Sequence, residues 1–62
     1  MENNIVYGNT LQNIGAAYLL KKDDKTGLDY YRLAKEHYEK YGYTNISQYQ
    51  MLIRNINALE QK

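Results

Sequence analysis

The sequence predicts an all-α protein made of an antiparallel helical hairpin and a third helix. Apolar residues recur every three or four positions in three segments, which is the period of an amphipathic helix. No segment alternates between apolar and polar residues as a strand does, and the 62 residues include no proline, the residue that interrupts helices. We therefore expect no sheet, and one helical domain over residues 1–62.

The first helix is expected over residues 4–22. Its apolar stripe is Tyr7, Leu11, Ile14, Gly15 and Tyr18. The polar segment 21–27 then predicts a turn. Asp23 or Asp24 is expected to cap the helix that follows, since a carboxylate there accepts from free backbone amides.

The second helix is expected over 25–41 and the third over 45–60. The main stripe of the second is Leu28, Tyr31, Ala34, Tyr38 and Tyr41, flanked by Tyr30, Leu33 and His37. Gly42 is placed to end it in the left-handed region. The third helix carries the apolar residues Ile46, Tyr49, Leu52, Ile53, Ile56 and Leu59. We expect Thr44 or Asn45 to cap it.

Small and large residues alternate in a recognisable way along the first two helices. The spacing is Leu11-x2-Ile14-Gly15-x2-Tyr18-x8-Gly27-x3-Tyr31-x2-Ala34. It resembles the tetratricopeptide repeat, a 34-residue helix–turn–helix unit, over residues 8–41. The chain departs from the family with Gly27 in place of the usual alanine and no proline after the second helix. The helix at 45–60 would then act as a capping helix; an ordinary three-helix bundle remains the alternative.

The tetratricopeptide resemblance implies a binding surface. In that family the ligand usually lies on the concave face formed by the first helix of each repeat. Carried over position by position, the partner-binding residues here are Asn9, Gln12, Asn13, Ala16, Leu19 and Leu20. Asn13 matches a position where many members bind a peptide backbone or terminal carboxylate through an amide, which donates and accepts at once. The alternative is that Asn13 is an ordinary solvated residue, and no basic partners for a carboxylate are evident nearby.

The end of the second helix is similar to repeats in peptide-sensing regulators of Gram-positive bacteria, which include the Rap-type phosphatases and related quorum-sensing receptors. The residues concerned are Tyr38-Glu39-Lys40-Tyr41-Gly42-Tyr43. This similarity implies a small bacterial or phage regulator that acts by binding.

The composition excludes several function classes. The chain has no cysteine and one histidine, so disulfides, thiolate sites and multi-histidine metal sites are excluded. A net charge of +1 gives no general attraction to nucleic acid or anionic membrane. No apolar run approaches the roughly 18 residues that span a bilayer. The N-terminal residues do not read as a secretion signal, so we expect a cytoplasmic protein.

We expect binding to a protein or peptide rather than catalysis, and no cofactor or metal. We expect His37 to be a partly exposed surface or rim histidine, since a catalytic role would need a nucleophile or base placed beside it. Ser47 is the only serine, and no nucleophile motif surrounds it. Because a single repeat cannot bury both of its faces, the expected partner is a second copy or a larger helical-repeat protein. The alternatives are a small helical nucleic-acid-binding factor, in which tyrosines stack on bases, and a fragment or designed variant of a longer repeat protein.

Overall fold

The computed structural model describes residues 4–61, which form three α-helices and no strand. The helices are α1 (Asn4–Leu20), α2 (Asp24–Lys40) and α3 (Ser47–Glu60). The predicted all-α fold class is confirmed. Residues 1–3, part of the segment in which no secretion signal was found, lie outside the described residues. Within residues 4–61, no helix is long and apolar enough to cross a membrane.

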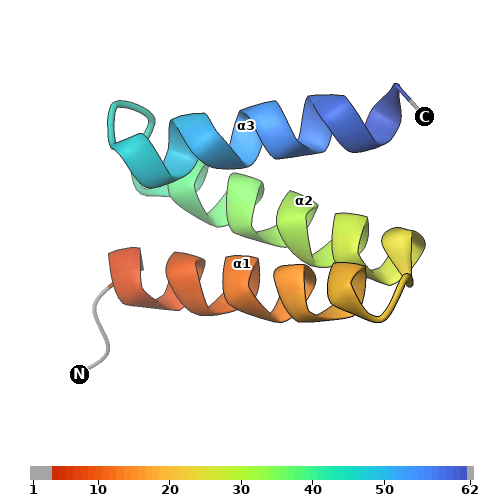
Figure 1. Cartoon of the computed structure of the whole chain (residues 1–62). Coiled ribbons are helices and arrows are strands. Elements are labelled where there is room, and N and C mark those ends of the chain that lie inside the picture. Colours follow the sequence, from red (N-terminus) through yellow and green to blue (C-terminus); the bar gives the residue numbers. More distant parts are fainter. Residues whose placement is uncertain (1–3, 62) are drawn as a thin grey trace.

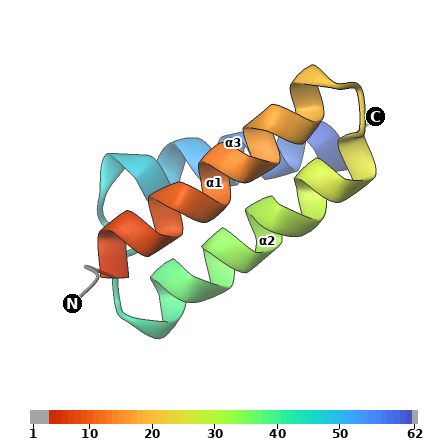
Figure 2. The same cartoon turned by 90° about the horizontal axis from the view of Figure 1, so that it is seen from below.

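The first two helices form an antiparallel hairpin, and α3 returns along α2 (Figure 1). α3 packs mainly against α2, and its contact with α1 is slight. In the view from below, α1 and α2 lie side by side in front and α3 lies behind them (Figure 2). One broad face of the hairpin is therefore left uncovered by α3.

The fully buried side chains of the core come from α2 and α3, and the rings of Tyr31 and Tyr38 also lie against Gly15 and Gly8 of α1. These buried side chains are Tyr31, Ala34 and Tyr38 of α2 with Leu52 and Ile56 of α3. Leu11 and Leu19 of α1 are only partly buried against this core. The buried residues of α1 are Gly8 and Gly15, which have no side chain to contribute. α2 is thus the central helix, and the backbone of α1 approaches it closely at the glycines.

Three glycines lie where α1 and α2 approach closely. A Cβ atom on Gly8 would lie 2.5 Å from the ring of Tyr38. A Cβ atom on Gly15 would lie 2.9 Å from the carbonyl oxygen of Gly27 and 2.8 Å from the ring of Tyr31. A Cβ atom on Gly27 would lie 2.9 Å from the carbonyl oxygen of Gly15 and from Leu19. Gly15 and Gly27 therefore face each other where the backbones of α1 and α2 come closest together.

Both α1 and α2 end in a Schellman motif, in which a residue with positive φ turns the backbone back onto the last helical turn. At the end of α1, Lys22 has a φ of 64° and the Asp23 amide donates to the Tyr18 carbonyl oxygen (2.9 Å). At the end of α2, Gly42 has a φ of 79° and the Tyr43 amide donates to the Tyr38 carbonyl oxygen (2.8 Å). The prediction for Gly42 is confirmed.

The predicted helix bounds need small corrections. The first helix ends at Leu20, two residues earlier than expected, because the left-handed turn falls at Lys22. Asp23 caps α2, as one of the two expected residues, by accepting from the Thr26 amide (3.2 Å). The third helix begins at Ser47 rather than residue 45. Its cap position is Ile46, which offers no side-chain hydrogen bond, so the expected caps were wrong.

Candidate functional site

An apolar groove lies between α1 and α2. It has a volume of about 220 Å³ and is lined by Tyr7 and Leu11 of α1 and by Leu33, Glu36, His37 and Lys40 of α2. We call these six residues the hairpin groove. No residue of α3 lines it, in keeping with the uncovered face of the hairpin (Figure 2). Helical spacing produces the groove, since positions 7 and 11 share one face of α1, while 33, 36, 37 and 40 share one face of α2.

An aromatic cluster of Tyr7, His37 and Tyr41 contributes two of its rings, Tyr7 and His37, to the lining of the hairpin groove. The ring of His37 lies 4.7 Å from the ring of Tyr7 and 4.9 Å from the ring of Tyr41, measured between centroids. The Nε2–H of His37 donates to the carbonyl oxygen of Asn4 (2.9 Å), since a carbonyl can only accept. His37 therefore ties the start of α1 to the end of α2. Its Nε2 atom is thus engaged in a structural hydrogen bond.

The hairpin groove is bordered by exposed apolar side chains. Leu33 is 48% exposed, Tyr7 44%, Tyr41 44% and Ile14 36%. The charged groups at its edge are Glu36 and Lys40, which carry opposite charges. Apolar area gathered on one face, rather than scattered singly, is typical of a surface that binds another protein.

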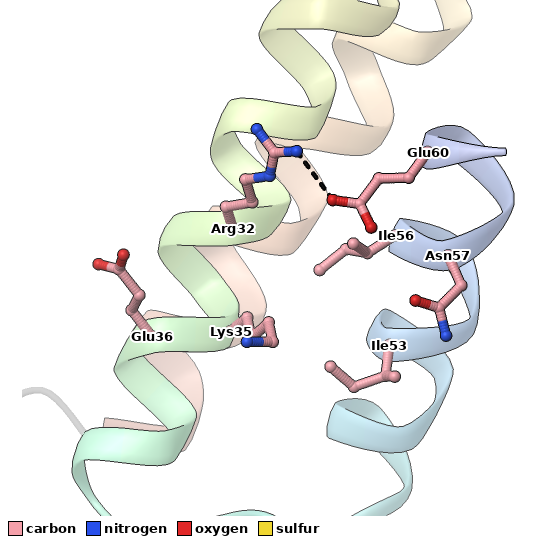
Figure 3. Close-up of a pocket in the computed structure, with 7 residues that line it drawn as sticks. All are labelled: Arg32, Lys35, Glu36, Ile53, Ile56, Asn57 and Glu60. Atoms are coloured by element: carbon pink, nitrogen blue, oxygen red, sulfur yellow. Dashed lines mark hydrogen bonds and ion pairs between the residues drawn. The ribbon is translucent and has the colours of Figure 1, made fainter. Parts of the chain in front are cut away.

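A second groove lies between α2 and α3 and has a volume of about 290 Å³ (Figure 3). Its lining combines Ile53 and Ile56 with the polar residues Arg32, Lys35, Glu36, Asn57 and Glu60. Figure 3 shows Arg32 and Glu60 reaching toward each other across the groove, where a guanidinium nitrogen donates to a carboxylate oxygen at 2.8 Å. Because this pair neutralises itself at an exposed position, it gives the groove little pull on a charged ligand.

A hydrogen bond between Tyr49 of α3 and Glu39 of α2 also links these two helices. The Tyr49 hydroxyl donates to a Glu39 carboxylate oxygen (2.6 Å), and Lys35 lies 3.3 Å from the same oxygen. The hydrogen bond from Tyr49, more than the nearby Lys35, holds the pKa of Glu39 below its usual value. The same hydrogen bond, with some burial, raises the pKa of the Tyr49 hydroxyl. This contact supports the fold and offers no reactive group.

The six residues expected to bind a partner lie along one side of α1, but they differ in accessibility. Asn9 accepts a short hydrogen bond from the buried Tyr38 hydroxyl, and Leu19 packs toward Gly27. Gln12 and Ala16 are half-buried. Asn13 and Leu20 are exposed, Leu20 at 87%. The structure therefore gives Asn9 and Leu19 contacts within the chain and leaves Asn13 and Leu20 free to meet a partner.

Sequence reasoning noted two residues of the hairpin groove, Leu33 and His37, only as a flanking stripe of the second helix. The sequence did indicate that this flanking stripe could contact another surface. The main apolar stripe of the same helix already accounts for its side that packs in the core. A second missed signal is that α1 carries no charged side chain over Asn4–Leu20. Both signals concern surfaces that the chain's own helices leave uncovered.

Among residues 4–61, no group of three or more histidine, cysteine, aspartate or glutamate side chains is placed to hold a metal ion. Comparison with protein-family models, with curated proteins and with solved structures finds no match to this chain.

Proposed function

We propose that this chain is a protein-interaction module whose hairpin groove binds an amphipathic helix of another protein. One observation carries the proposal: apolar and aromatic side chains line a groove on the hairpin face that α3 leaves uncovered. Laying the apolar face of a helix into such a groove is a common mode of recognition. The chain would then act by binding rather than by catalysis.

The resemblance to the tetratricopeptide repeat suggests what kind of partner fits. In stacked helical repeats each hairpin covers its neighbour, and the uncovered face of a terminal hairpin accepts one more helix. A larger helical-repeat protein is therefore the partner we favour. Peptide-sensing regulators of the Rap type are one such class, with the chain acting as a small bacterial or phage regulator in the cytoplasm.

The two charged residues at the edge of the hairpin groove would favour one orientation of the partner helix. Glu36 and Lys40 lie one helical turn apart beside the apolar lining. A partner helix that carries a basic and an acidic residue one turn apart pairs with both in one direction only. Such edge charges contribute to specificity more than to affinity.

The contacts of α1 favour peptide binding on its concave side less than they favour helix binding in the hairpin groove. Of the six residues on that side, Asn9 is hydrogen-bonded to Tyr38 and Leu19 packs toward Gly27. A peptide would meet mainly Asn13 and Leu20, which is a small contact area.

The test compares two charge substitutions at similarly exposed apolar residues. Leu33→Glu places a charge in the hairpin groove, and Met51→Glu places one on α3, where Met51 is 56% exposed. Immobilised wild-type chain and the Met51→Glu control should retain the same protein from an extract of the source cells, while Leu33→Glu should lose it. Circular dichroism establishes that both variants remain helical. Retention of the same protein by Leu33→Glu contradicts the proposal.

A further inference from the structure

A pair of stacked tyrosines lies at the end of the hairpin where the chain turns from α1 into α2. Tyr18 belongs to the last turn of α1 and Tyr30 to the second turn of α2. Their ring centroids are 5.6 Å apart, and the two ring planes differ by 7°. This is the geometry of an offset-stacked aromatic pair. Both side chains are half-buried, so the two rings lie against each other and remain reachable from solvent.

A second tyrosine pair, Tyr38 and Tyr49, lacks these properties. Its ring planes are nearly perpendicular, at 87°, and Tyr38 is fully buried. The hydroxyls of Tyr38 and Tyr49 both donate hydrogen bonds within the chain. Within residues 4–61, by contrast, the hydroxyls of Tyr18 and Tyr30 make no hydrogen bond to the chain. Tyr18 and Tyr30 therefore combine facing rings with phenol groups that a reagent in solution can reach.

We propose that Tyr18 and Tyr30 form a site of oxidative cross-linking, at which a haem peroxidase with hydrogen peroxide joins the two rings as dityrosine. Each phenol gives up one electron and one proton and becomes a tyrosyl radical. The two radicals couple by a carbon–carbon bond between the ring carbons ortho to the hydroxyls, and the hydrogens on these carbons move to the oxygens. The chain thus loses two hydrogen atoms, which reduce one hydrogen peroxide to two molecules of water.

The hairpin brings the two rings together before any oxidation. Gly15 and Gly27, which face each other across α1 and α2, stand three residues before Tyr18 and Tyr30. The close approach of the helices therefore occurs about one helical turn from the stacked rings. Holding two reacting groups in contact makes their coupling far faster than a collision between separate molecules. Coupling within one chain should therefore prevail over cross-linking between chains.

Such a cross-link would supply a covalent staple that the chain otherwise lacks. Small domains are commonly stabilised by disulfides or a structural metal. This sequence has no cysteine, and no cluster of metal-binding side chains occurs among residues 4–61. Dityrosine would join α1 to α2 and restrict the unfolded chain, as a disulfide does. Exposure to peroxide would thus stabilise the hairpin.

The cross-linking site is independent of the hairpin groove. Neither tyrosine of the stacked pair lines the groove, and the cross-link involves no partner protein. Failure of either proposal therefore leaves the other unaffected.

The test treats the folded full chain with a haem peroxidase and hydrogen peroxide at low micromolar concentration. The wild type should give a monomeric product that is lighter by two hydrogen atoms, shows dityrosine fluorescence and yields peptides joined through Tyr18 and Tyr30. Tyr30→Phe keeps the ring and removes the phenol, so its yield of this product should fall by roughly tenfold or more. Tyr43→Phe is the matched control and should give the wild-type yield, since Tyr43 packs against the core elsewhere. Circular dichroism establishes that both variants remain helical.

Two further measurements separate the folded contact from general tyrosine reactivity. The purified monomeric product should have a higher Tm than the untreated chain. In concentrated urea the yield of that product should fall, because the stacked contact is lost. A cross-link that maps to other tyrosines overturns the proposal, as does an equal yield from Tyr30→Phe or from the unfolded chain. Oxidation confined to covalent dimers or to Met51, or a product whose Tm is no higher, also overturns it.

Discussion

At the scale of single residues, the contact between α1 and α2 depends on having no side chain at Gly15 and Gly27. The space that a Cβ atom would occupy on either glycine is already taken by the carbonyl oxygen of the other. Backbone atoms cannot rotate away as a flexible side chain can, so the two helices would have to separate. Separation would also withdraw α1 from the ring of Tyr31.

We expect Gly15→Ala to destabilise the fold although alanine is the better helix former. Higher helix propensity would stabilise α1 by about 1 kcal/mol, while overpacking costs about 1–3 kcal/mol. The net loss should lower Tm by several degrees, measured by thermal denaturation. Asn55→Ala on the exposed face of α3 is the control and should raise Tm slightly. If Gly15→Ala raised Tm as well, the close approach at this position would be disproved.

The Tyr49–Glu39 hydrogen bond should be visible in the titration of Glu39. Because the tyrosine hydroxyl favours the ionised carboxylate, the pKa of Glu39 is lowered in the folded chain. The associated stabilisation is present above the carboxyl's unfolded pKa, about 4.3, and is lost as the pH falls through the lower folded pKa. Tyr49→Phe should raise the pKa of Glu39, measured by NMR of its side-chain carboxyl carbon. An unchanged pKa in Tyr49→Phe, with Tyr30→Phe as control, would count against the contact.

At the scale of helices and turns, the two Schellman motifs differ in the residue that adopts positive φ. Gly42 does so without steric cost, whereas Lys22 at 64° brings its Cβ close to the following carbonyl. The turn between α1 and α2 is therefore slightly strained, because glycine would fit the backbone at position 22 better than lysine does.

Lys22→Gly should stabilise the chain by about 0.5–1 kcal/mol, because glycine removes that steric cost. Thermal denaturation should show Tm rising by about 4 °C for a domain of this size. Lys21→Gly is the comparison, since residue 21 does not have positive φ; that change should lower Tm. A lower Tm for Lys22→Gly would mean that residue 22 is not left-handed in solution.

The sequence was informative about helices and less so about which faces they bury. The periodicity identified three helices within two residues of their observed ends, and Gly42 and Asp23 were correctly placed in the turns. The end of α1 was placed too late because a lysine with positive φ carries no sequence signal. The predicted cap of α3 was wrong. Thr44 and Asn45 are residue types that often cap helices, but the helix begins later and its cap position is Ile46.

At the scale of the whole molecule, the candidate site was only partly predictable. The stripe of Leu33 and His37 was visible in the sequence, but its role depends on α3 lying behind the hairpin, which local periodicity does not specify (Figure 2). Likewise, the expected binding side of α1 came from a family resemblance. The resemblance did not predict the hydrogen bond between the Tyr38 hydroxyl and the Asn9 side chain. The tetratricopeptide relationship itself stays a prediction.

The molecule as a whole has a thin core and an uneven surface. Its buried side chains come from α2 and α3, whereas α1 carries no charged residue and exposes the apolar residues Val6, Tyr7, Ile14 and Leu20. A domain of this size buries only about 60% of the surface of its unfolded chain. Contacts with other chains would supply burial that the single chain lacks, which connects its stability to its proposed role.

The most direct test of the interaction module is site-specific photo-crosslinking within the source cells. A photoreactive phenylalanine analogue at position 33 lies in the hairpin groove, and the same analogue at position 51 lies on α3. We expect a discrete covalent adduct with a larger protein from position 33 and none from position 51. The absence of any adduct from position 33, with the chain folded and expressed, would contradict it.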